Sequence, residues 1–111
     1  MGRKTIAAQI IDDLVGFKGA DGHFLIVYDF ASKIGETTHQ NFFTNLHRIM
    51  EELGDGLRVQ RSIIECKHEL TVKAISALCK YYGARDITIY EVKNAVYMSL
   101  TVADQKCDDN G

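Results

Sequence analysis

The sequence lacks an apolar run long enough to cross a membrane. Its longest run, from Phe24 to Tyr28, has the length of a β-strand, whereas a membrane-spanning helix needs about 20 apolar residues. The N-terminus also lacks the apolar stretch and the small-residue cleavage site of a secretory signal. These two absences predict a cytoplasmic protein that makes no membrane contact.

Metal-binding and catalytic motifs are also missing. The three cysteines are widely spaced and form no C-x-x-C pair, and no histidine pair completes a zinc pattern. We expect Cys66 and Cys79 to be small core residues, because free cysteine is usually buried. The sequence contains no P-loop, no dinucleotide fingerprint and no nucleophile–base motif. Nothing in it therefore points to a generic hydrolase or nucleotide-binding enzyme.

A strong excess of charge is absent as well. The chain has 13 Lys and Arg residues against 15 Asp and Glu residues, a formal net charge of −2. This balance argues against a surface that attracts phosphate everywhere, but it is compatible with a local basic stripe. The 111 residues, 46% hydrophobic and 25% charged, are typical of one globular domain.

Three segments show the apolar periodicity of an amphipathic helix. They are residues 6–15, the stretch from a capping box at Thr37 and Gln40 to Gly54, and about 71–82. We expect the first helix to pack on the domain, because its apolar stripe would otherwise stay exposed. A partner-binding arm is the alternative.

Strands are predicted at 23–29, at 57–66 with a bulge or break at 60–62, and at 86–92 and 95–102 around a turn at Lys93 and Asn94. The order of elements predicts an α+β protein: a ferredoxin-like split βαβ sheet of four to five mainly antiparallel strands with helices on one face, plus an extra N-terminal helix. We divide the chain into an N-terminal helix and Gly-rich connector (1–22), a ferredoxin-like domain (23–103) and a disordered acidic tail (104–111).

Asp29 is the strongest candidate for a catalytic or metal-binding residue. It ends the most apolar predicted strand, at the kind of sheet edge where ligands usually bind. A magnesium ion keeps most of its waters and needs only one or two carboxylates there. The alternative is that Asp29 caps the following turn.

Three motifs occur in a recognisable order: IVYD at 26–29, RVQRSIIE at 58–65 and DITIY at 86–90. In order and spacing, over residues 23–92, they resemble the small CRISPR-associated protein that partners the spacer integrase, the "Cas-two" family. The middle motif is the most specific of the three. The family usually begins at its first strand and often has a further acidic residue after Tyr-Asp. Here a helix precedes that strand, and Phe30 follows Asp29.

The resemblance implies a CRISPR adaptation subunit, active in antiviral defence, that binds DNA or RNA as a homodimeric scaffold and contacts an integrase subunit. The two sheets would face each other across a two-fold axis. Asp29 from both chains would share one Mg²⁺ ion for phosphodiester hydrolysis, a nuclease activity. Within the matched motifs, structural or interface roles fall to Tyr28, Gln60, Ser62 and Glu65. Gln60 and Ser62 are equally compatible with hydrogen-bonded core polar groups.

Five basic residues are candidates for phosphate contacts: Lys33, Arg48, Arg58, Arg61 and Lys67. Each is also compatible with an ordinary solvated surface charge. In a regular strand Arg58 and Arg61 would point to opposite faces, and phosphate contacts would make binding steeply salt-dependent. Two other functions fit the same fold: a non-catalytic dimerisation or regulatory module, and a toxin-like ribonuclease.

Overall fold

The computed structural model describes residues 4–30 and 36–93 of the chain. The elements are α1 (Ile6–Asp13), β1 (Asp21–Phe30), α2 (Glu36–Leu53), β2 (Leu57–Gln60), β3 (Ile63–His68), α3 (Glu69–Tyr81) and β4 (Ala84–Glu91). The predicted strand at 95–102, the acidic tail at 104–111 and Lys33 lie outside the described residues. None of the helices in this described part is long and apolar enough to cross a membrane.

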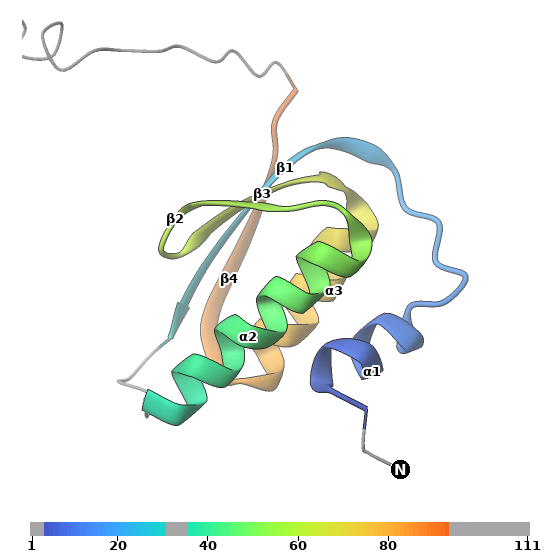
Figure 1. The fold of residues 1–111 in the computed structure, drawn as a ribbon. Helices are drawn as coiled ribbons and strands as arrows, with labels where there is room; N and C mark the ends of the chain where they lie inside the picture. The colour runs from blue at the N-terminus through green and yellow to red at the C-terminus, as the bar shows by residue number, and fades with distance from the viewer. Residues whose placement is uncertain (1–3, 31–35, 94–111) are drawn as a thin grey trace, which may run out of the picture.

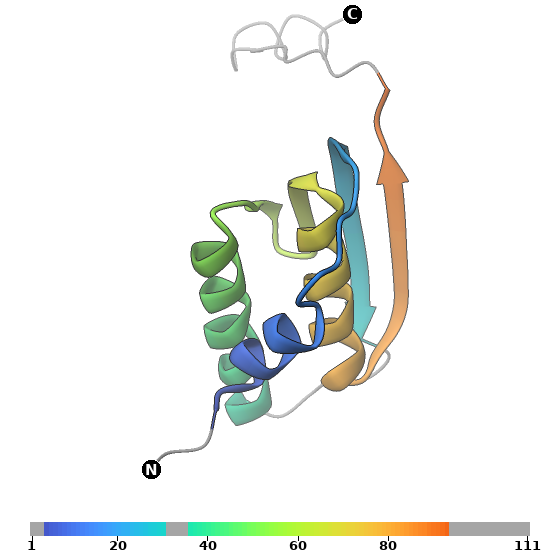
Figure 2. The ribbon, with the colours of Figure 1, turned by 90° about the vertical axis from the view of Figure 1, so that its right-hand side faces the viewer.

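The four strands form one antiparallel sheet in the order β2-β3-β1-β4. The helices α1, α2 and α3 all lie on one side of this sheet, so the protein has two layers (Figures 1 and 2). The predicted α+β class is confirmed, and the strand order and directions are compatible with a ferredoxin-like fold. We call the side of the sheet away from the helices its outer face.

The core lies between the sheet and the helices. Alternate residues of β1 point toward the helices and are buried, namely Phe24, Ile26 and Tyr28. They meet Phe42, Leu46 and Ile49 of α2 and Ile75, Leu78 and Cys79 of α3. Cys66 and Cys79 are buried as predicted, and burial raises the pKa of each thiol to about 12.

Helix α1 packs on the helix layer, as expected. The side chain of Thr5 caps it by accepting the N–H of Ala8 at 3.0 Å. Ala7 belongs to the core, and its N–H donates to Oδ1 of Asn45 on α2 at 3.0 Å. The Asn45 amide also donates to the Tyr82 hydroxyl at 3.2 Å. Because α1 is held on this side, it leaves the outer face of the sheet open (Figure 2).

The predicted break at 60–62 divides the segment into two strands: β2 and β3 are separate antiparallel strands joined by a turn at Arg61 and Ser62. One detail of the predicted elements was wrong. Helix α2 begins at Glu36, so Thr37 lies in its first turn and does not cap it. Gly54 and Gly83 follow their helices with φ of 62° and 84°, which confirms both as helix stops.

Candidate functional site

Asp29 lies near the end of β1 on the outer face, directly opposite Asp86 of β4. Arg85 bridges the two carboxylates: its Nη2 donates to Asp29 Oδ2 at 2.8 Å, and its Nε donates to Asp86 Oδ2 at 3.0 Å. All three side chains are more than half exposed. The hydrogen bond to Asp86 and the charges of both carboxylates raise the pKa of Arg85.

The magnesium site that the resemblance implies takes Asp29 from two chains, whereas a single copy brings Asp29 together with Asp86. In a single copy the available oxygen ligands are two carboxylates, and the guanidinium of Arg85 forms ion pairs with both. The part of the chain that the structure describes contains no group of three or more His, Cys, Asp or Glu side chains that could hold a metal ion. What the three residues form is an exposed charge cluster. Magnesium-dependent hydrolysis at Asp29 stays an untested prediction.

Sequence reasoning missed the partners of Asp29. Asp86 was part of a recognised motif but had no assigned role, and Arg85 had none either. A signal was present: a strand that runs antiparallel to β1 and starts near residue 86 brings its first residues to the end of β1. The alternative role for Asp29, capping the turn that follows it, involves residues 31–35 and lies outside the described part.

Arg58 and Arg61, two of the five basic candidates, both lie near the core residue Tyr28. The guanidinium carbon of Arg58 is 4.2 Å from the ring centre of Phe43 on α2, a cation–π contact. Arg61 lies in the β2–β3 turn, where its carbonyl accepts the Tyr28 hydroxyl at 2.8 Å. Burial raises the pKa of Tyr28 to about 12, although the charges of both arginines act in the opposite direction. Because Arg61 is outside a regular strand, the predicted alternation with Arg58 does not apply.

The other described basic candidates lie elsewhere. Arg48 lines a shallow groove between α1 and α2, together with Glu51 and Glu52. Lys67 lies near the opposite end of β3 from Arg61. These residues therefore do not form one continuous basic surface with the β2–β3 turn, and Lys33 lies outside the described residues.

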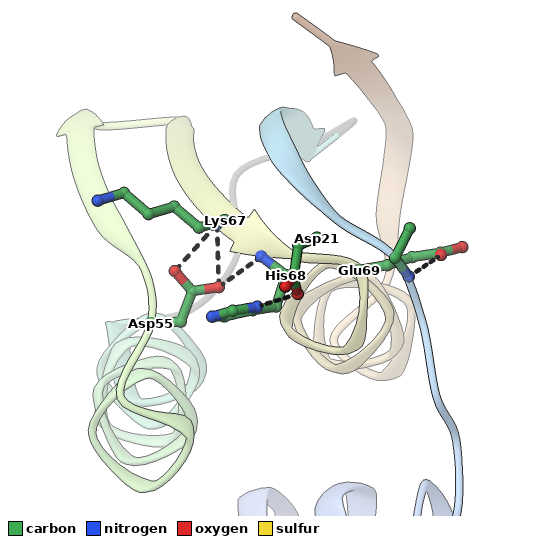
Figure 3. A network of polar contacts seen from close by, with 6 residues as sticks. Asp21, Asp55, Lys67, His68 and Glu69 are labelled. Atoms are coloured by element: carbon green, nitrogen blue, oxygen red, sulfur yellow. Dashed lines mark hydrogen bonds and ion pairs between the residues drawn. The ribbon is translucent and has the colours of Figure 1, made fainter.

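Lys67 belongs to a polar network at the amino end of β1 (Figure 3). The Asp55 carboxylate accepts the backbone N–H groups of Lys67 and His68 at 3.0 Å. Nδ1 of His68 lies 2.7 Å from Asp21 Oδ1, and the Glu69 carboxylate accepts the Ala20 N–H at 2.9 Å. These contacts tie the loop after α2 and the connector before β1 to the junction of β3 and α3. The network is structural.

The outer face carries mainly apolar side chains in two cross-strand rows. The first row is Leu57, Glu65, Leu25 and Tyr90, and the second is Ile63, Val27 and Thr88. Leu57 and Tyr90 are 59% and 55% exposed. The charged exception, Glu65, is buried and pairs with Nε2 of His23. Of the other predicted interface residues, Gln60 and Ser62 are exposed at the β2–β3 turn, and the Ser62 carbonyl accepts the Tyr28 N–H at 3.1 Å.

Comparison of the chain with family models, curated proteins and solved structures finds no match. The resemblance to the Cas-two family therefore rests on the three sequence motifs and on a compatible fold. Neither alone assigns an activity.

Proposed function

We propose that the protein is a homodimeric nucleic-acid-binding scaffold in which two copies pack their outer faces around a two-fold axis. The observation that carries this proposal is the open outer face. One side of an antiparallel sheet can face water, but it then usually carries polar side chains. Here no described helix lies on the outer side of the sheet (Figure 2), and the strand registers place two rows of mainly apolar side chains on that side. An exposed apolar patch of this kind is typical of an interaction surface.

The charges on this face favour a second copy as its partner. Glu65 is paired with His23 of the same chain, so burying the centre of the face does not require an oppositely charged partner. Two identical faces then meet without repulsion at their centres, in the isologous arrangement that two-fold symmetry imposes. The exposed cluster of Asp29, Arg85 and Asp86 lies at the end of the sheet, where it would form part of a polar rim.

The size of the face is sufficient for a small to standard dimer interface. Strand spacing and rise per residue give the four-stranded sheet a flat footprint of roughly 400 Å². A standard interface buries about 800 Å² of accessible surface per partner, and weaker complexes bury less. Side-chain relief makes the accessible area larger than the footprint, so the face approaches this size without reaching the range of large obligate dimers.

Nucleic-acid binding is proposed from the β2–β3 turn and from the resemblance. Arg61 in the turn and Arg58 in the adjoining strand β2 are exposed and have no carboxylate partner in the described part of the chain. In a dimer this pair is present twice, which makes a two-ended surface for the phosphates of DNA or RNA. We propose CRISPR adaptation, with an integrase subunit as partner, as the setting for this scaffold. In this role Asp29 is a salt-bridge residue.

A non-catalytic interaction module that binds no nucleic acid is the second candidate. It is favoured by the separation of the basic residues, because Arg48 and Lys67 lie away from the β2–β3 turn. Both candidates share the outer-face dimer, so the two differ only in the nucleic-acid contact.

The test is duplex DNA and single-stranded RNA binding, measured by fluorescence anisotropy between about 50 and 200 mM salt. We expect binding that weakens steeply with salt. Arg61→Gln should reduce the salt slope by about one, the change expected for one lost phosphate contact. Arg48→Gln, an equal charge change between α1 and α2, is the matched control and should leave the slope unchanged. Salt-independent binding, or no binding by the wild-type dimer, would contradict the nucleic-acid-binding scaffold and favour the interaction module.

A further inference from the structure

The first cross-strand row of the outer face ends in a hollow on one side and an exposed aromatic side chain on the other. At one end, Leu57 borders a groove of about 670 Å³ formed with the loop that follows α2. At the other end, Tyr90 lies on the edge strand β4 and is 55% exposed. The row runs straight across the sheet, because Leu57 pairs with Glu65, Glu65 with Leu25 and Leu25 with Tyr90.

The lining of the groove has the chemistry that a tyrosine side chain needs. Its apolar part is formed by Met50 and Leu57, and Leu57 is 59% exposed. Lys67 lines the same groove, and its ammonium has no ion pair in the part of the chain that the structure describes. A buried tyrosine packs its ring on apolar neighbours and gives its hydroxyl a hydrogen-bond partner. The hydroxyl oxygen is an acceptor, and a lysine ammonium is a donor.

Two-fold symmetry brings the two ends of this row together in one of two simple face-to-face arrangements. If the axis runs parallel to the strands, between β1 and β3, then β2 of each copy lies over β4 of the other, and Tyr90 meets Leu57. If the axis runs along the row, each strand lies over its own equivalent. In that case Leu57 meets Leu57 and Tyr90 meets Tyr90. Both arrangements are isologous, so the side chains decide between them.

The position of Glu65 favours the axis parallel to the strands. Glu65 is second in the row, is buried, and pairs with His23 of the same chain. An axis along the row would place it opposite Glu65 of the other copy, and like charges juxtaposed across an interface are unfavourable. An axis parallel to the strands places it opposite Leu25, the third residue of the row. Glu65 then keeps His23 as its partner and meets an apolar side chain.

We infer that the two copies pack with their axis parallel to the strands, so that Tyr90 of each copy fills the groove beside Leu57 of the other. This inference rests on the proposed dimer and specifies how its copies are oriented. Neighbouring strands are about 4.8 Å apart, so Leu57 and Tyr90 of one chain are separated by about 14 Å across the sheet. Their side chains therefore meet only between chains.

The experiment is crosslinking of the full-length chain with a short bismaleimide in a Cys107→Ser background. Cys66 and Cys79 are buried, so the introduced cysteine is the accessible thiol. Leu57→Cys chains are mixed with Tyr90→Cys chains that carry a mass tag. We expect a crosslinked dimer with one chain of each kind, and no crosslink in either variant alone. Crosslinks in either variant alone would overturn the inference, as would a wild-type dimer whose mixed variants give no crosslink. A monomeric wild type would instead overturn the proposed dimer.

A charge exchange tests the same contact without a crosslinker. Tyr90→Glu should weaken dimerisation, and adding Leu57→Lys should recover at least about tenfold in dimer affinity, because opposite charges then meet across the interface. Adding Tyr81→Lys instead places the same charge on α3 in the helix layer. This matched control should recover nothing. If Leu57→Lys restores no more affinity than Tyr81→Lys does, the orientation is contradicted even where sedimentation shows that the wild type is a dimer.

Discussion

Replacing His23 by leucine should destabilise the protein because it removes a partner of a buried carboxylate. The Glu65 side chain is 11% exposed and that of His23 is 20% exposed. Removing one partner of a fully buried ion pair costs about 3–5 kcal/mol, and leaving a buried polar group unsatisfied costs about 1–3 kcal/mol. Because solvent still reaches part of the pair and Glu65 has further contacts, we expect a loss of about 2 kcal/mol in the free energy of unfolding.

The chain offers a matched control. His68 pairs with Asp21 in the same way, but these side chains are 51% and 84% exposed. An exposed pair contributes about 0–1 kcal/mol, so His68→Leu should have little effect. Replacing His23 and Glu65 together by leucine should recover most of the loss, because an apolar pair of similar volume removes the uncompensated charge.

The assay is urea unfolding followed by circular dichroism, at one pH and one protein concentration because dimer dissociation depends on concentration. The reasoning is refuted if His23→Leu loses no more stability than His68→Leu. It is also refuted if the double variant is less stable than His23→Leu, since the carboxylate would then not be the source of the loss.

Three further predictions test the core and the Asp29 cluster. Phe42→Ala should lower the free energy of unfolding by about 3–5 kcal/mol. The reason is that this fully buried ring packs on four aromatic neighbours, with ring centroids 5.1–5.8 Å away. A loss below about 1 kcal/mol in urea unfolding would contradict the place of Phe42 in the core. Asp29→Asn should change stability by less than about 1 kcal/mol, because its pair with Arg85 is exposed, and it should leave nucleic-acid affinity unchanged in the anisotropy assay. Stability should also fall as pH rises from about 9 toward about 12, because the Cys66 and Cys79 thiols, whose folded pKa is about 12, stay protonated while those of the unfolded chain ionise. Alkaline unfolding of a variant with both cysteines replaced by alanine should have a shallower slope, and an unchanged slope would contradict the raised pKa values.

The sequence predicted the order of the described elements because their apolar periodicity is strong. The 23–29 strand and the helices that end before Gly54 and Gly83 were located to within a few residues. The sequence left a bulge or a break open at 60–62, because Arg61 and Ser62 carry no glycine, asparagine or proline signal for a turn. Local pattern alone does not distinguish a bent strand from a tight hairpin in such a segment.

The site was harder to predict than the fold, because its contacts depend on strand register. Asp29 was found from its place at the end of a strand, but Arg85 is 56 residues away in the sequence and meets it only when β1 and β4 pair. His23 and Glu65 are 42 residues apart and come together across β1 and β3. Contacts between residues so far apart in the sequence depend on which strands pair and in what register, and the apolar periodicity of a single strand does not predict that register.

The most direct test of the proposed dimer is sedimentation equilibrium of Tyr90→Glu beside Tyr81→Glu. These tyrosines are 55% and 61% exposed, but Tyr90 lies on the outer face and Tyr81 lies on α3 in the helix layer. We predict that the wild type and Tyr81→Glu form the same dimer, whereas Tyr90→Glu dissociates at least about 100-fold more readily, because it places a charge within the interface on both sides of the axis. A monomeric wild type, or equal dimerisation of the two variants, would contradict the outer-face dimer.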